Sequence, residues 1–226
     1  MNFKHFIPPV LSIVYQRLCD YKSFRVPEVY KGIYNKKLDL PILKEDAWLS
    51  KNWLFKAKKS NFYINPTDSH QFALQILAEE LLITYKEFYI FDFGGGTTNL
   101  SKMLINNNEG ISVNNMQYVV LDCEPTCIIG KDRMKEAIFC SNFEQVNTNI
   151  SYSNGIIIAN SSLHYCVNWK EIILLFIKMN PLYIIIGRHP VPLEQSEPIF
   201  TIQTIVNCGQ SYVILIPLDI LVQEMN

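Results

Sequence analysis

Net charge is nearly absent from this 226-residue chain. Its 20 Lys and Arg residues are balanced by 21 Asp and Glu residues, which gives a formal net charge of -1. A protein that binds DNA or RNA needs a basic face to neutralise phosphates, so the composition predicts no nucleic acid partner. A local cluster of Lys51, Lys56, Lys58 and Lys59 is an exception, which we interpret as the solvated face of a helix.

A zinc-binding pattern is also missing. None of the six cysteines forms a Cys-x-x-Cys pair, and the closest two, Cys123 and Cys127, have no second pair to complete a set of four ligands. Several cysteines lie in apolar stretches that are typical of buried strands. Buried free thiols are typical of a reducing compartment. We therefore expect a cytoplasmic protein without a metal site.

The chain lacks a long uninterrupted apolar run. The stretch 172–186 contains Lys178, Asn180 and Pro181, whereas a membrane-spanning helix needs about 20 predominantly apolar residues. The short apolar stretch 6–14 is interrupted by two prolines, and no small-residue cleavage site follows it. The sequence therefore predicts no transmembrane segment and no secretory signal.

Apolar residues are nevertheless abundant, at 49% of the chain, which is enough for a domain with a sizeable core. Apolar strands are predicted at 88–93, 117–122, 137–140, 155–160 and 182–187. Helices are predicted at 72–85, 100–105, 126–136 and 169–179. This alternation predicts an α/β fold with a Rossmann-like, doubly wound, mostly parallel sheet and helices on both faces.

The N-terminal part is less regular. Its clearest segment is an aromatic-rich helix around Trp48 and Trp53, which we expect either to cover a ligand site or to pack this part on the core. We predict a helical arm or lid over residues 1–70 and a Rossmann-like domain over residues 71–226.

Three consecutive glycines follow the first predicted strand, which ends near an acid. The residues are Asp92 and, after Phe93, Gly94, Gly95 and Gly96. Glycine tolerates positive φ and has no Cβ, so the backbone can turn sharply and a ligand can lie against it. The start of the next helix then presents unpaired N–H groups. A turn without a ligand remains the alternative.

The pattern after the glycines discriminates between ligands. No lysine follows before Lys102, so the turn does not match a phosphate-binding P-loop. Asn99 stands where the dinucleotide pattern G-x-G-x-x-G has its third glycine. The run Asp92–Thr97 looks like the glycine turn over which the amino-acid part of S-adenosylmethionine lies, a cofactor without phosphate.

A second acid, Asp122, ends the next strand. It lies somewhat beyond the about 20 residues that separate glycines and ribose-binding acid in dinucleotide sites. A carboxylate at this strand end can accept hydrogen bonds from both hydroxyls of a ribose, and Glu124 competes for the role. The sequence thus predicts a site for an adenosine cofactor.

Polar residues also follow the last two parallel strands. Ser161, Ser162 and His164 come after the strand 155–160, and His189 comes after the strand 182–187. The carboxyl ends of parallel strands line the ligand crevice. His164 is therefore the first candidate for a general base and His189 the second, with a purely structural role as the alternative for each.

Together these segments resemble class I S-adenosylmethionine-dependent methyltransferases. More narrowly, they are similar to a poorly characterised family of methyltransferase-like proteins associated with bacterial surface-polysaccharide gene clusters. The resemblance covers roughly residues 5–205. Its matching stretches are 91–97, 119–122 with Pro125 behind it, 159–165, 183–190 and 201–203.

The resemblance implies S-adenosylmethionine as cofactor and transfer of its methyl group to an oxygen of a small molecule or glycan precursor. It implies that Asp92 and the three glycines hold the methionine part of the cofactor and that Asp122 holds the ribose. It implies that Asn142 or a neighbour approaches the adenine and that Ser161 and Ser162 line the crevice near the methyl group.

The sequence departs from the family pattern at three places. Thr98 replaces a further glycine, and the end of the second strand, 122–125, is one residue longer than usual. Only one strand, 210–217, is predicted where the class has an antiparallel pair near the C-terminus. A shortened sheet with an exposed edge favours self-association. These departures leave a non-enzymatic binding or assembly protein as an alternative. An NAD-dependent nucleotide-sugar oxidoreductase is a weaker one, because the third glycine and a Tyr-x-x-x-Lys pair are absent.

Overall fold

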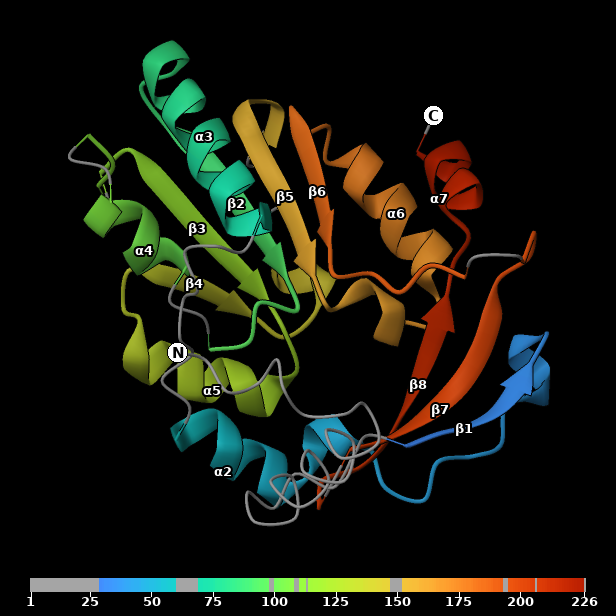
Figure 1. Ribbon diagram of the computed structural model, residues 1–226. Helices are drawn as coiled ribbons and strands as arrows, with labels where there is room; N and C mark the ends of the chain where they lie inside the picture. Colours follow the sequence, from blue (N-terminus) through green and yellow to red (C-terminus); the bar gives the residue numbers. More distant parts are fainter. Residues whose placement is uncertain are drawn as a thin grey trace, which may run out of the picture.

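The computed structural model describes residues 29–59, 69–97, 100–107, 110–112, 114–146, 152–192, 195–205 and 207–225. Two sheets organise this part of the chain, a five-stranded parallel sheet and a three-stranded antiparallel sheet. Figure 1 shows the parallel sheet at the centre, with the arrowheads of β2, β3, β5 and β6 directed toward α2 and the antiparallel sheet.

The parallel sheet has the strand order β4-β3-β2-β5-β6. Its strands are β2 (Phe88–Phe93), β3 (Met116–Leu121), β4 (Ala137–Cys140), β5 (Gly155–Asn160) and β6 (Tyr183–Gly187). The chain winds outward from β2 in one direction through β3 and β4 and then in the other through β5 and β6. The order therefore reverses between β2 and β5, which is where doubly wound sheets bind ligands.

Strands β2 and β5 form in the centre of the sheet because their sequences are almost continuously apolar, as expected for strands covered on both faces. In β2, Phe88 and Ile90 belong to one buried cluster, whereas Phe91 and Phe93 belong to the other. The predicted α/β, doubly wound fold is confirmed, and each of the five predicted strands lies within one residue of its observed position.

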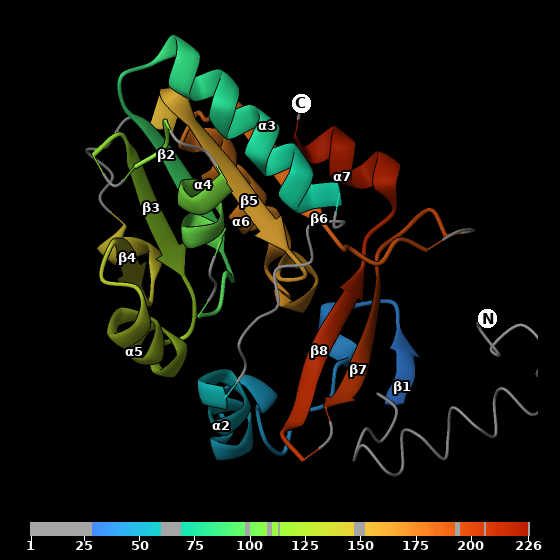
Figure 2. The ribbon, with the colours of Figure 1, turned by 60° about the vertical axis from the view of Figure 1, so that its left-hand side comes forward.

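Helices cover both faces of the parallel sheet (Figure 2). On one face lie α3 (Ser69–Thr84) and α4 (Leu100–Asn107), which contribute Leu74 and Leu104 to the first cluster. On the other lie α6 (Trp169–Lys178) and α7 (Leu218–Glu224), which contribute Phe176 and Leu221 to the second cluster. α5 (Glu124–Arg133) follows β3 and packs against β4.

The antiparallel sheet corrects the expectation for the C-terminal part of the chain. Both strands of an antiparallel pair are present, β7 (Ile199–Ile205) and β8 (Gly209–Leu215), whereas the sequence predicted only one. β1 (Val29–Tyr34) pairs with the other edge of β7. These strands form a sheet separate from the parallel one. The prediction missed β7 because Thr201, Gln203 and Thr204 interrupt its apolar pattern.

The described part of residues 1–70 contains more than helices. Besides β1 it holds three short helices, η2 (Lys37–Asp39), η3 (Ala47–Leu49) and α2 (Lys51–Lys59). The predicted helix around Trp48 and Trp53 thus exists as η3 and α2, while β1 was not predicted. The boundary between arm and domain at residue 70 stays a prediction, and the departure at Thr98 lies outside the described residues.

Five cysteines in the described ranges are free thiols, at positions 123, 127, 140, 166 and 208. No helix in these ranges is long and apolar enough to cross a membrane. The same residues contain no group of three or more His, Cys, Asp or Glu side chains that could hold a metal ion.

Candidate cofactor and acceptor site

The glycine turn lies between β2 and α4, and each of its glycines has a different surrounding. Gly94 and Gly96 adopt positive φ values of 66° and 65°. A Cβ on Gly94 would lie 2.3 Å from the Cβ of Ser162, and one on Gly95 would lie 2.4 Å from the carboxyl carbon of Asp92. A Cβ on Gly96 would meet no heavy atom within 4 Å. The turn is therefore packed on its inner side and open at Gly96.

Asp92 supports the turn from inside the protein. Its side chain is 1% exposed, and its Oδ2 accepts a hydrogen bond from the hydroxyl of Tyr118 at 2.7 Å. Burial raises the pKa of Asp92 to about 7, although the Tyr118 hydrogen bond opposes the rise. The carboxyl group lies beneath Gly95, so its contact with the methionine part of a cofactor stays a prediction.

Asp122 is tied directly to the open end of the turn. Its Oδ2 accepts the backbone N–H of Gly96 at 2.8 Å, and its Oδ1 accepts the backbone N–H of Cys123 at 2.7 Å. Burial raises the pKa of Asp122, and these two hydrogen bonds lower it in part. The side chains of Cys123 and Thr126 also hydrogen-bond to this carboxylate and lower its pKa further. The structure thus brings two predicted cofactor residues together.

The two predicted serines differ in burial and in hydrogen bonding. Ser162 is buried, and its hydroxyl donates to the backbone carbonyl of Phe93 at 2.6 Å, which joins the end of β2 to the segment after β5. Ser161 is partly exposed and has a φ of 55°. Ser162 is therefore a structural tie beside Gly94, and the predicted contact of both serines with a cofactor stays untested.

Asn142 lies after β4 and is exposed. It caps η4 (Phe143–Gln145), where its Oδ1 accepts the backbone N–H of Gln145 at 3.0 Å. This capping explains the residue type by local structure alone. Its predicted approach to adenine stays a prediction.

His164 lies in η6 (Leu163–Tyr165), directly after β5, and is 7% exposed. Its ring centroid is 4.1 Å from that of Tyr165 and 5.8 Å from that of His189. Burial, helped by the nearby His189, lowers the pKa of His164 to about 4. The ring is therefore neutral at physiological pH and can accept a proton.

Trp48 was predicted either to cover a ligand site or to pack the arm on the core, and the structure places it beside the site. Its indole N–H donates to the hydroxyl of Ser211 in β8 at 2.9 Å, and its ring lies edge-on to Tyr165 with centroids 4.6 Å apart. The backbone carbonyl of Trp48 accepts a weak contact from the Cys123 thiol at 3.9 Å. The arm thus approaches the carboxyl edge of the parallel sheet.

Two further residues at the site were not singled out from the sequence. Tyr118, the hydrogen-bond partner of Asp92, is a buried hydroxyl in an apolar strand. Arg133 at the end of α5 donates to the carbonyl of Ala57 at 3.0 Å, to the carbonyl of Lys58 and to the hydroxyl of Thr97 at 3.3 Å. Arg133 therefore connects α2 with the glycine turn. A polar group in an apolar strand was the available signal for Tyr118, whereas Arg133 gave none.

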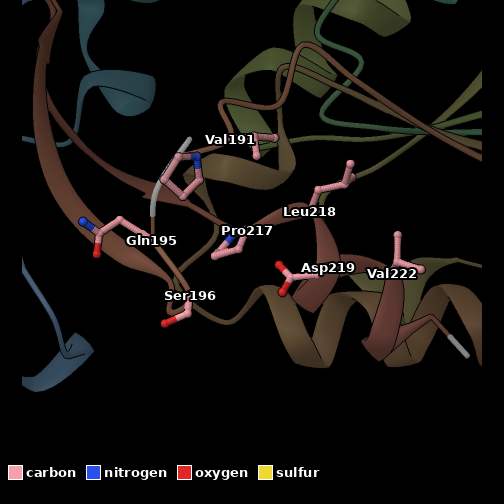
Figure 3. A pocket seen from close by; sticks show the side chains of 8 residues that line it. Val191, Gln195, Ser196, Pro217, Leu218, Asp219 and Val222 are labelled. Atoms are coloured by element: carbon pink, nitrogen blue, oxygen red, sulfur yellow. The ribbon is translucent and has the colours of Figure 1, made fainter.

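A surface depression of about 860 Å³ lies elsewhere. Figure 3 shows it between the segment after β6, with Val191, and α7, with Leu218, Asp219 and Val222. None of the predicted cofactor residues lines this depression. We therefore locate the candidate site at the carboxyl edge of the parallel sheet instead.

Comparison with known proteins gives likenesses of structure only. No protein-family profile matches the sequence, and no curated protein matches it. Similar solved structures include an S-adenosylmethionine-dependent methyltransferase from Clostridium acetobutylicum ATCC 824, with 10% identity and a TM-score of 0.45 over 70% of this chain and 79% of that one. The sugar N-methyltransferase KedS8 from Streptoalloteichus sp ATCC 53650 has 8% identity and a TM-score of 0.49 over 85% and 87%.

The DszA carbon methyltransferase has 16% identity and a TM-score of 0.37 over 48% of this chain. The match spans only 30% of the DszA chain. Likenesses at these identities and TM-scores do not decide an activity, which has to be inferred from the geometry of the site.

Proposed function

We propose that this chain is an S-adenosylmethionine-dependent methyltransferase that acts on an oxygen of a small molecule or glycan precursor. The observation that carries the proposal is the open space beside Gly96, next to the carboxylate of Asp122. A turn that opens toward a ligand and ends at an acid fits an adenosine cofactor with ribose hydroxyls to donate.

The same geometry favours a cofactor without phosphate. In a phosphate-binding turn, backbone N–H groups are free to donate to the anion. Here the N–H of Gly96 donates to Asp122 and is therefore not free to donate to a phosphate. The turn also contains no lysine that could pair with a phosphate. S-adenosylmethionine therefore fits better than NAD.

In this proposal the glycines and Asp122 hold the cofactor, with Asn142 toward its adenine and Ser161 at the crevice wall. Asp92 and Ser162 keep the turn in place from inside, through Tyr118 and Phe93. When bound, S-adenosylmethionine supplies an electrophilic methyl carbon, whose bond to sulfur breaks as its bond to the acceptor oxygen forms. The protein contributes orientation and exclusion of water.

His164 is the group that receives the hydroxyl proton of the acceptor. Its ring is buried and neutral, so an unprotonated nitrogen is available as hydrogen-bond acceptor. The acidity of a hydroxyl rises as its oxygen gains a methyl group, so even a weakly basic imidazole can take the proton at that stage. Tyr165, packed on His164, fixes the ring.

The experiment that tests the proposal is calorimetric titration of the full chain with S-adenosylmethionine, S-adenosylhomocysteine and NAD. We expect micromolar binding of the first two and none of NAD. Absence of binding by a protein that melts cooperatively would refute the proposal and leave the non-enzymatic alternative. Binding of NAD alone would establish the oxidoreductase alternative instead.

A further inference from the structure

The arm segment 29–59 differs in charge from the chain as a whole. It contains eight lysines and no arginine, against three acidic residues, Asp39, Glu45 and Asp46. The segment therefore has an excess of five positive charges, whereas the whole chain has a formal net charge of -1. Figure 1 and Figure 2 show β1 and α2, with which the segment begins and ends, at the end of the molecule opposite α3. The positive charges thus gather at one end of the protein.

The same segment exposes several large apolar side chains. Leu38 and Ile42 are 93% and 94% exposed, the highest values among the large apolar side chains of the described residues. Ile33, Leu49 and Phe55 are exposed as well. Single exposed apolar residues are normal, whereas a group of them among charged residues marks an interaction surface.

The most exposed of these side chains flank a fixed point of the backbone. Leu40, between Leu38 and Ile42, is partly buried against the second cluster. The carbonyl of the neighbouring Pro41 accepts a hydrogen bond from the hydroxyl of Tyr212 in β8 at 2.9 Å. The structure therefore holds the apolar ends of Leu38 and Ile42 at the surface, where a partner can bury them.

The outer face of α2 combines an aromatic ring with lysines. Phe55 is exposed, and so are Lys51, about one turn before it, and Lys56, the next residue. Ala57, which is buried, marks the inner face of the helix. At the surface of a bilayer, lysine keeps its ammonium group among the lipid headgroups while an aromatic side chain enters the boundary of the acyl chains.

The residue types of the segment favour a bilayer over other partners. Lysine is depleted at protein–protein interfaces. Nucleic acid recognition relies on the forked guanidinium group of arginine, which this segment lacks, and it gives aliphatic side chains such as Leu38 and Ile42 no role on the phosphates. A bilayer with anionic lipids accommodates both kinds of group, because its headgroups attract ammonium groups and its acyl chains take up apolar side chains.

We propose that the arm segment 29–59 is a docking surface for a lipid bilayer that contains anionic lipids. Its lysines pair with the headgroups, and Leu38, Ile42 and Phe55 enter the boundary of the acyl chains. This proposal does not depend on the proposed methyltransferase activity. Only in combination with that activity does it point to a methyl acceptor at a membrane surface.

Co-sedimentation with vesicles tests the proposal on the full chain. Vesicles of phosphatidylcholine alone are compared with vesicles of phosphatidylcholine and phosphatidylserine in equal parts. We expect binding to the vesicles with phosphatidylserine only, and we expect it to weaken as added salt screens the lysines. Absence of binding to these vesicles, or equal binding to both kinds, overturns the proposal.

A double variant tests the apolar side chains. Leu38→Asn with Ile42→Asn leaves the net charge unchanged, and thermal melts verify that the variant folds. Affinity for the vesicles with phosphatidylserine should fall by about tenfold or more. Ile83→Asn replaces a similarly exposed isoleucine on α3, at the opposite end of the molecule, and should bind as the wild type does. An equal loss in Ile83→Asn overturns the assignment to the arm.

A second double variant tests the lysines. Each lysine near an anionic surface strengthens binding by about fivefold, so Lys51→Gln with Lys56→Gln should weaken vesicle binding by about twentyfold. Lys86→Gln with Lys178→Gln, at two other exposed positions, is the matched control. Equal weakening in the control overturns the assignment to the arm. Release of the protein from the vesicles by duplex DNA at equal phosphate concentration would assign the arm to nucleic acid and overturn the proposal as well.

Discussion

The carboxyl edge of the parallel sheet has two halves, which differ in how their polar side chains are hydrogen-bonded. At the ends of β2 and β3, Asp92 is bonded to Tyr118, and Asp122 is bonded to Gly96 and Cys123. At the ends of β5 and β6, the nitrogens of His189 and one nitrogen of His164 are buried without partners in the described chain. The carboxylates of the first half are held by internal hydrogen bonds, whereas these imidazole nitrogens of the second half have none among the described residues.

This difference has a functional consequence in our account. Internal bonds preorganise the glycine turn, so that cofactor binding needs little rearrangement. In our proposal the second half receives the methyl acceptor, whose hydroxyl proton passes to His164. The predictions below separate the two halves, starting with the largest effect.

Substitution of Gly95 should weaken cofactor binding at the glycine turn, in the half of the edge formed by the ends of β2 and β3. In Gly95→Val the new Cβ would lie 2.4 Å from the Asp92 carboxyl carbon, so either the turn or Asp92 must move. We expect S-adenosylhomocysteine affinity to fall by about a hundredfold or more, roughly 3 kcal/mol. Isothermal calorimetry measures this. Gly94→Val is no suitable control, since its Cβ would clash with Ser162.

Gly96→Ala is the matched control for that variant. Its Cβ enters open space, and the cost is that of positive φ, about 1 kcal/mol. Stability should therefore drop less in Gly96→Ala than in Gly95→Val. Equal melting temperatures for the two variants would contradict the packing described around Asp92.

Asp92 should make the stability of the protein depend on pH. Its pKa rises from the ordinary 3.8 to about 7 on folding, so between these pH values the folded state holds a proton that the unfolded state releases. Stability contributed by this group is thus lost as pH rises through about 7, by up to about 4 kcal/mol. Asp92→Asn should lack this loss, and denaturant unfolding at pH 5 and pH 8 compares the two proteins.

Tyr118→Phe gives a second test of the pH dependence assigned to Asp92. The Tyr118 hydrogen bond lowers the pKa of Asp92, so its removal should raise that pKa further and shift the loss of stability to higher pH. Denaturation curves with identical pH dependence in the wild type and Asp92→Asn would show that Asp92 is not the group responsible.

The smallest effect on stability is expected where Arg133 connects α2 with the glycine turn. Arg133→Gln removes donors to the carbonyls of Ala57 and Lys58 at the end of α2. Hydrogen bonds from a charged group contribute about 1.5–3 kcal/mol when well formed. Hydrogen exchange should accelerate in α2 while β2 and β3 stay protected. Lys131→Gln, an exposed position on the same helix, is the control, and faster exchange in it would contradict the assignment to Arg133.

The sequence predicted the local patterns of the site, but it did not predict which side chains meet across neighbouring strands. The glycine turn and both acids were recognised because they are local patterns at the ends of apolar strands. The hydroxyl of Tyr118 and the closeness of His164 to His189 were not foreseen, because both depend on the parallel register of neighbouring strands. Each histidine was considered alone, and only the fold makes them a pair.

β1 illustrates a second limit of prediction. Val29, Tyr30, Ile33 and Tyr34 are residue types enriched in strands, but Lys31 and Gly32 interrupt them, and the segment is too short to stand out. It forms because it pairs with β7, and Lys31 lies 170 residues from Thr201, whose hydroxyl contacts its carbonyl. Pairing over such a separation leaves no trace in local periodicity, which is also why the complete antiparallel sheet was not predicted.

The most direct test of the account compares S-adenosylhomocysteine affinity in Asp122→Asn and His164→Gln. Asp122 is bonded to the glycine turn and His164 lies beside His189. We predict that Asp122→Asn weakens binding by about tenfold or more, while His164→Gln changes it by less than about twofold. Weakening by His164→Gln to the same degree, or unchanged affinity in Asp122→Asn, would contradict the assignment of the cofactor to one half of the edge and the acceptor to the other.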